Sequence, residues 1–282
     1  MLDKTIHPIG IGTWAMGGAR MDDGTIFADY ARDSEEAEAI RYAVSLGQNH
    51  IDTAQLYGAG HTEEIVGAAI KGLNRGAIYI ATKVWKSHAA SRLAVCRAVE
   101  ESLRKLGTGY VDLIYTHAPF DGVSTETTIM GLNDAVDAGL ARSIGVSNYD
   151  LDQLKEAVEI SPKPIVANQL LYNILHRGLV TPEMLAFCRE RDITIVAYRP
   201  VERRLLADKS ANQTVNEIAA RYKRPVAQIA INWLIGQPGV VTIPKAVARA
   251  HIEENLNSVE FSLSDEDRAL LDHVSNVSKL AR

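Results

Sequence analysis

The sequence predicts a single-domain α/β protein over residues 1–282, a (β/α)8 barrel with two additional helices. Short apolar runs alternate with helical patterns from end to end, eight such runs occur, and no Gly-x-Gly-x-x-Gly motif follows the first. Alternating strands and helices require parallel pairing through right-handed crossovers, and eight such units close naturally into a barrel. An open doubly wound sheet is the alternative, which the missing glycine motif disfavours.

The predicted strands are rich in Val, Ile, Leu and Tyr, as expected for strands buried on both faces. In chain order they cover residues 9–12, 49–52, 78–82, 113–116, 143–146, 165–169, 194–198 and 240–243. The glycine-containing segment 17–33 is the widest predicted loop and resembles a mobile flap.

Helices are predicted between the strands from apolar spacing and from start signals. The first begins at Ser34, which is expected to cap the amide of Ala37. Pro182 after Thr181 is typical of a first-turn proline behind a cap. The others cover residues 61–70, 90–106, 127–138, 150–160, 182–191, 214–222 and 248–256, and the two additional helices cover residues 226–236 and 264–274.

Composition narrows the classes of partner. Hydrophobic residues make up 46% and charged residues 23% of the chain, which are the proportions of a globular domain. A formal net charge of -5 predicts no general attraction to nucleic acid or to anionic lipid. The most apolar window, residues 225–244, contains Gln228, Asn232 and Pro238, so the sequence does not predict a membrane-spanning helix there.

Targeting and metal-binding signals are not evident. The first residues lack the apolar core of a signal peptide, and Cys96 and Cys188 have no second Cys or His at metal-ligand spacing. His50 and His61 suggest a metal site only weakly, because His61 is expected to start a helix. We expect a cytoplasmic protein without a metal ion, monomeric or weakly self-associating.

Polar residues stand at the carboxyl ends of the predicted strands, where barrel enzymes place their active sites. From the second strand to the eighth they are Asp52, Lys83, His117, Ser147-Asn148, Asn168-Gln169, Tyr198-Arg199 and Pro244-Lys245. Each residue alone has a structural explanation, as a cap, a half-buried aromatic or a solvated lysine. Their joint occurrence at successive strand ends favours a catalytic site.

These residues belong to longer motifs that resemble the aldo-keto reductases from Gly10 to about Val274. The motifs are Asp52-Thr53-Ala54 with Tyr57-Gly58, Thr82-Lys83-Val84-Trp85, Asp112-Leu113-Ile114 leading to His117 and Pro119, Gly145-Val146-Ser147-Asn148, Gln169 with Tyr172-Asn173, Ala197-Tyr198 with Pro200, and Ile243-Pro244-Lys245 with Glu254-Asn255-Leu256. Seven motifs in the family's order make the resemblance specific.

The resemblance implies a reductase of aldehyde or ketone carbonyls in which Tyr57 donates the proton. A nearby ammonium stabilises phenolate, so Lys83 is expected to move the pKa of Tyr57 toward neutrality. Asp52 would keep Lys83 protonated and in place. His117, neutral, would donate a hydrogen bond to the substrate oxygen.

The resemblance also implies an NADP(H) site. Ser147, Asn148 and Gln169 would bind the nicotinamide carboxamide, and Tyr198 would stack on the ring. Lys245 would meet the 2′-phosphate. The remaining cofactor residues are Arg199, Pro200, His251, Glu254 and Asn255, with Glu254 and Asn255 at the adenine and Arg199 at the pyrophosphate or an acidic substrate.

Two positions depart from the family pattern at the phosphate. Ala246 stands where Ser is common, and His251 stands where Arg is common. An imidazole does not replace a guanidinium fork evenly. We therefore expect NADP(H) to bind with reduced discrimination against NAD(H).

The substrate pocket is expected to have an apolar wall, because Trp14, Met16, Trp85 and Phe120 follow the first, third and fourth strands. Arg199, Arg203 and Arg204 would add positive charge to one side.

Two other functions remain open from sequence. One is a non-catalytic, nicotinamide-binding homologue with a regulatory or redox-sensing role, against which the intact catalytic set argues. The other is an aldolase that forms a Schiff base on Lys83.

Overall fold

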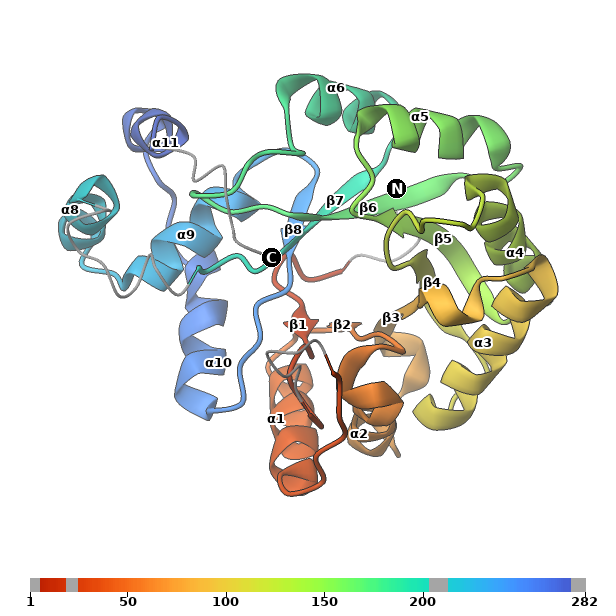
Figure 1. The fold of residues 1–282 in the computed structure, drawn as a ribbon. Coiled ribbons are helices and arrows are strands. Elements are labelled where there is room, and N and C mark those ends of the chain that lie inside the picture. The colour runs from red at the N-terminus through yellow and green to blue at the C-terminus, as the bar shows by residue number, and fades with distance from the viewer. Residues whose placement is uncertain (1–5, 19–24, 203–212, 275–282) are drawn as a thin grey trace.

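The computed structural model describes residues 6–18, 25–202 and 213–274, and its eight parallel strands form one sheet (Figure 1). The strands follow one another in chain order, and each pairs with its successor. They are β1 (Ile11–Gly12), β2 (His50–Asp52), β3 (Tyr79–Val84), β4 (Val111–Thr116), β5 (Ala141–Ser147), β6 (Ile165–Leu171), β7 (Thr194–Tyr198) and β8 (Val240–Thr242). The eight predicted strands are confirmed, with ends that differ by at most two residues.

Backbone hydrogen bonds between the first and last strands close the sheet into a barrel. Ile9 forms a parallel bridge with Thr242, and the amide of Gly12 donates to the carbonyl of Pro244 at 3.1 Å. A Cβ on Gly12 would lie 2.3 Å from the carbonyl oxygen of Ile243, so this closure requires glycine. The open doubly wound alternative is therefore wrong.

The helices surround the barrel (Figure 1). They are α1 (Asp33–Ser45), α2 (His61–Ile70), α3 (Arg92–Leu106), α4 (Thr125–Asp137), α5 (Leu151–Ile160), α6 (Pro182–Glu190), α8 (Gln213–Tyr222), α9 (Val226–Ile235), α10 (Arg249–Leu256) and α11 (Asp265–Asp272). α9 packs against β8 and α10, whereas α8 and α11 pack against each other outside them. The additional helices are thus α8 and α11, and the assignment of residues 226–236 as additional is corrected.

Local start signals explain most helix boundaries. Thr181 accepts a hydrogen bond from the amide of Met184 in front of Pro182, as predicted, and Asp150 forms a reciprocal capping box with Gln153. The predicted cap at Ser34 is wrong. Helix α1 already begins at Asp33, behind Arg32 and without a side-chain cap, so Ser34 lies inside it.

The pleat of the strands aims alternate side chains into the barrel. On β3, Tyr79 and Ala81 face the inner core, while Ile80 and Val84 face the helices. Lys83 shares the phase of Tyr79 and Ala81 and stands near the carboxyl end of β3. Because all eight strands are parallel, the polar residues at their carboxyl ends lie on the same rim of the barrel.

The described part of the predicted flap is held against the first two helices. The amide of Gly17 donates to buried Glu36 at 2.7 Å, and Thr62 donates to the carbonyl of Met16 at 2.5 Å. Residues 19–24 of this loop, like Arg203 and Arg204, lie outside the described residues. Among the helices the structure describes, none is long and apolar enough to cross a membrane.

Candidate active site

Lys83 is the centre of a buried polar cluster at the carboxyl rim of the barrel. Its Nζ donates to Asp52 Oδ1 at 2.5 Å, to the carbonyl of Thr53 at 2.9 Å and to Tyr57 Oη at 3.2 Å. Gln169 Nε2 donates to the other oxygen of Asp52 at 2.7 Å. The three donors of the ammonium are therefore all engaged, and Lys83 is fully buried.

Charge pairing keeps Lys83 protonated. Burial lowers the pKa of Lys83, but the combined effect of Asp52 and the Tyr57 oxygen raises it by more than burial lowers it. The net shift of the pKa is therefore upward. The structure thus agrees with the expectation that Asp52 holds an ammonium in place next to the phenol.

Tyr57 follows β2 at the start of a short 3-10 turn, Tyr57–Gly60, and its ring is 8% exposed. Burial raises the pKa of Tyr57, and the positive charge of Lys83 offsets only part of this rise. The sequence-based expectation of a pKa moved toward neutrality is therefore wrong. Lys83 acts in the predicted direction, but burial acts more strongly.

His117 lies across from Tyr57, with ring centroids 5.7 Å apart in an edge-to-face arrangement. Burial, and secondarily the charge of Lys83, lowers the pKa of His117 to about 3. The imidazole is therefore neutral at ordinary pH and carries one N–H to donate. Its backbone amide donates to the carbonyl of Val84 at 3.1 Å, which fixes the loop after β4 to β3.

The amide and hydroxyl groups after β5, β6 and β7 form one network beside this cluster. Asn148 Nδ2 donates to the carbonyl of His117 and to Ser147 Oγ, both at 3.1 Å, and Tyr198 Oη donates to Asn148 Oδ1 at 2.9 Å. Ser147 Oγ donates to the carbonyl of Gln169 at 3.0 Å. This set of donors and acceptors fits a carboxamide, and the half-buried ring of Tyr198 fits a flat heterocycle.

Left-handed backbone conformations occur at two of these strand ends. Asn148 has φ 60°, and Arg199 has φ 52°. Non-glycine residues in this region cost free energy and cluster at functional sites. The exposed side chain of Arg199 stands at the rim, next to buried Pro200, and its carbonyl accepts from Asn173 at 2.9 Å.

The residues expected at the cofactor phosphate and adenine lie in the segment after β8 and on α10. Lys245 is exposed, and its charge lowers the pKa of Glu35 as a minor influence beside Arg32. His251 on α10 is exposed, while Glu254 and Asn255 are partly buried. Helix α10, which carries His251, Glu254 and Asn255, packs against α1.

Aromatic side chains line the approach to Tyr57 and His117. Trp14 meets the Tyr57 ring edge-to-face at 4.9 Å, and Trp85 meets His117 at 5.0 Å and Phe120 at 5.7 Å. Trp14 is 42% exposed, so this wall faces solvent. The prediction that Met16 lines the substrate pocket is wrong, because its side chain is fully buried in the main hydrophobic core.

Two polar residues of this region have contacts that the sequence did not indicate. Gln55 makes four side-chain hydrogen bonds between the loops after β2 and β3 and helix α3. Fully buried His50 packs edge-to-face on Tyr79 inside the barrel, and burial lowers its pKa to about 4. The only sequence signal for Gln55 was a polar amide between Asp52 and Tyr57.

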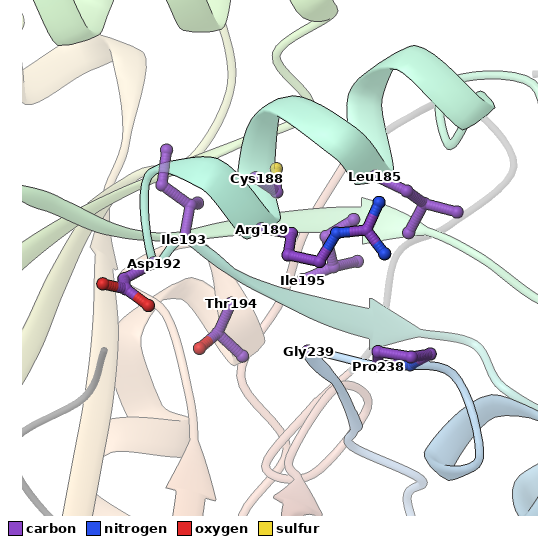
Figure 2. A pocket seen from close by; sticks show the side chains of 9 residues that line it. All are labelled: Leu185, Cys188, Arg189, Asp192, Ile193, Thr194, Ile195, Pro238 and Gly239. Atoms are coloured by element: carbon purple, nitrogen blue, oxygen red, sulfur yellow. The ribbon is translucent and has the colours of Figure 1, made fainter.

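A small cavity of about 140 Å³ lies at the opposite end of the barrel (Figure 2). Leu185, Cys188 and Ile195 line it together with Pro238, at the end of α6 and the starts of β7 and β8. Burial raises the pKa of the Cys188 thiol to about 12, so this sulfur stays protonated at neutral pH. The cavity shares no residue with the cluster around Lys83.

The sequence matches a family model described as "Aldo/keto reductase family" over residues 8–276. It is 33% identical over 273 residues to "Methylglyoxal reductase YeaE" of Escherichia coli, covering 96% of this chain and 91% of the relative. A second Escherichia coli protein, "NADH-specific methylglyoxal reductase", is 29% identical over 317 residues, covering 95% of this chain and 94% of the relative.

Solved structures agree with this assignment. The aldo-keto reductase Tm1743 in complex with the inhibitor epalrestat superimposes with a TM-score of 0.90 at 41% identity and covers 98% of both chains. An aldo/keto reductase from Klebsiella pneumoniae in complex with NADP and acetate gives a TM-score of 0.83 at 31% identity, over 97% of this chain and 93% of that one.

Proposed function

Because this chain belongs to the aldo/keto reductase family, we propose that it reduces aldehyde or ketone carbonyls to alcohols with NADP(H) or NAD(H) as cofactor. The observation that supports this most directly is the position of Lys83 Nζ, within hydrogen-bond distance of both Asp52 and Tyr57. An acid, its neighbouring cation and a neutral imidazole meet at one rim.

The residues of the chain divide the work of carbonyl reduction. A bound nicotinamide supplies the hydride for the carbonyl carbon. Tyr57 Oη gives its proton to the carbonyl oxygen, and the ammonium of Lys83 stabilises the phenolate that remains until solvent restores the proton. His117, neutral because its pKa is lowered, donates a hydrogen bond to the oxygen as negative charge develops there.

The network of Ser147, Asn148 and Tyr198 supports the proposed nicotinamide site, and Gln169 joins it to the catalytic cluster through Asp52. We propose that Lys245 is the main cation for the 2′-phosphate. Because Ala246 follows Lys245 and the exposed residue at position 251 is His rather than Arg, the chain would distinguish NADP(H) from NAD(H) only weakly. One relative named NADH-specific and one NADP complex among similar structures are consistent with such latitude within the family.

The Schiff-base alternative finds no support at Lys83. A nucleophilic lysine needs a free lone pair, which requires a lowered pKa. Here the pKa of Lys83 is raised and its three donors are engaged. Borohydride treatment with a carbonyl compound is therefore expected to leave Lys83 unmodified, as peptide mass spectrometry would establish.

The proposal is tested with wild type and Tyr57→Phe. The purified protein is titrated with NADPH and NADH by fluorescence, and consumption of reduced cofactor is then followed with glyoxals, benzaldehydes, aldoses and keto acids. We expect saturable binding in both proteins and a kcat lowered by about 10²- to 10⁴-fold in Tyr57→Phe, the usual contribution of a positioned proton donor. Tyr110→Phe, which removes a phenol flanked by Arg75 and Arg142, is the matched control and should keep wild-type turnover.

The outcomes separate the candidate functions. Binding of either cofactor without turnover of any carbonyl would favour the non-catalytic, regulatory homologue. Absence of saturable binding for both cofactors would refute each nicotinamide-dependent function.

A further inference from the structure

Gln55 is buried, with 8% of its surface exposed, and its side-chain amide uses every hydrogen-bonding position that it has. Its Nε2 donates to the carbonyl of Ala98 at 2.7 Å and to Ser102 Oγ at 3.1 Å. Its Oε1 accepts from the amide of Trp85 at 3.0 Å and from His88 Nδ1 at 3.1 Å. A primary amide has two donors and two principal acceptor sites, so no capacity is left over.

The side-chain partners of Gln55 belong to two other parts of the chain. Ala98 and Ser102 lie on buried turns of α3, and Trp85 and His88 lie in the loop that leads from β3 to α3. The backbone amide of Gln55 also donates to the carbonyl of Lys83 at 3.2 Å. Gln55 therefore joins the loop after β2 to a strand, to a helix and to the next loop.

The segment that Gln55 holds carries Tyr57 two residues later. The Tyr57 hydroxyl has one hydrogen bond among the described residues, from Lys83 Nζ at 3.2 Å, so the position of the phenol depends on its backbone. That backbone continues through Gly58 and Ala59 with φ of 52° and 53°. A left-handed Ala59 persists only where the surroundings hold it, which makes the contacts of Gln55 important for this turn.

We propose that Gln55 is a positioning residue, which locks the Tyr57 loop to the Trp85 loop and thereby sets the distance from the proton donor to the carbonyl oxygen. The proposal rests on the proposed function, because it assigns Gln55 a part in the same proton transfer. A misplacement of about 1 Å costs on the order of 10²-fold in rate, so loss of this lock reduces kcat more than KM.

Asn133 provides a matched control. It is also a buried amide whose Nδ2 donates to a backbone carbonyl, of Ile129, and to a serine hydroxyl, of Ser161, while its Oδ1 accepts from the amide of Lys163. Ser161 and Lys163 lie in the loop between α5 and β6. This network is therefore at the end of the barrel opposite to the rim that carries Lys83 and Tyr57. A purely structural role for Gln55 predicts that equivalent substitutions at the two amides have equivalent effects.

The test compares Gln55→Leu, Gln55→Glu and Asn133→Leu with wild type. We expect kcat to fall roughly 10- to 100-fold in Gln55→Leu, with cofactor affinity retained. Gln55→Glu keeps both acceptor contacts and loses the donors, so its kcat should lie between those of Gln55→Leu and wild type. Asn133→Leu should keep wild-type kcat although it is destabilised to urea.

Hydrogen–deuterium exchange supplies a readout that needs no substrate. In Gln55→Leu, peptides covering residues 55–60 and 85–91 should exchange faster than in wild type and in Asn133→Leu. Wild-type exchange in both peptides, or wild-type kcat in Gln55→Leu, would overturn the proposal. An inactive wild-type protein would refute the proposed function alone, and the exchange rates would still decide whether Gln55 is the lock.

Discussion

Replacing Asp52 by asparagine removes the negative charge that compensates buried Lys83 while nearly preserving side-chain size. In the native cluster Asp52 accepts from Lys83 at 2.5 Å and from Gln169 at 2.7 Å. The asparagine amide presents one acceptor and one donor group, so it satisfies Lys83 only by directing an N–H toward Gln169. Breaking a buried ion pair on one side costs about 3–5 kcal/mol, a large part of the roughly 5–15 kcal/mol stability of a typical domain.

The pH dependence of stability should also change sign. In the wild type the folded-state pKa of Lys83 is raised above its unfolded value, so its contribution is full at neutral pH and is lost as pH rises through the folded pKa. Without Asp52, burial becomes the dominant influence and lowers the folded pKa. The unfolded chain then binds more protons, so the stability of Asp52→Asn rises with pH until the unfolded lysine pKa of about 10.4 is reached.

Urea unfolding followed by circular dichroism at several pH values between 7 and 9 measures both effects. Asp112→Asn is the control. Asp112 is equally buried but pairs with Arg75 at 2.8 Å, and arginine keeps its proton throughout this range. It should lose stability without acquiring the new slope. A loss below about 1 kcal/mol in Asp52→Asn, or a stability that falls with pH, would refute the assigned charge state of Lys83.

Three further outcomes are expected. Because the pKa of His117 is lowered to about 3, its imidazole stays neutral as pH falls, and NMR should detect no titration of its ring between pH 5 and 8. His251→Arg should tighten NADPH by about tenfold in fluorescence titrations and leave NADH unchanged, since a guanidinium pairs with phosphate more strongly than imidazole does. Gly12→Ala should strongly lower the urea midpoint, because its Cβ would meet the carbonyl of Ile243 at 2.3 Å.

The meeting of Asp52, Tyr57, Lys83 and His117 was predictable because parallel neighbours in a barrel end at one rim. The local sequence pattern predicts where each strand ends. Residues at the ends of adjacent parallel strands that point to the same face of the sheet must then lie close together. The pKa of Tyr57 was not predictable in this way, because the degree of burial depends on loops such as the one that carries Trp14.

Features that depend on packing between elements escaped the sequence pattern. The contacts of Gln55 require the registry of α3 against two loops, which spacing alone does not encode. Helices α8 and α9 are both ten residues long, so their lengths do not show which of them packs against the barrel. In the structure α9 buries residues 228–234 and packs against β8, whereas α8 buries only Val215, Ile218 and Ala219. Ser34 carried a valid start signal, but the helix already begins one residue earlier, at Asp33.

Closure of the barrel through residues 8–12 and 240–244 sets an order on assembly at the ribosome. The segment around Ile9 cannot pair until residues 240–244 have been synthesised, and such distant pairings are slow to form. Until then the nascent sheet keeps two unpaired edges, so chains that stall late in translation are the ones most exposed to edge-to-edge aggregation.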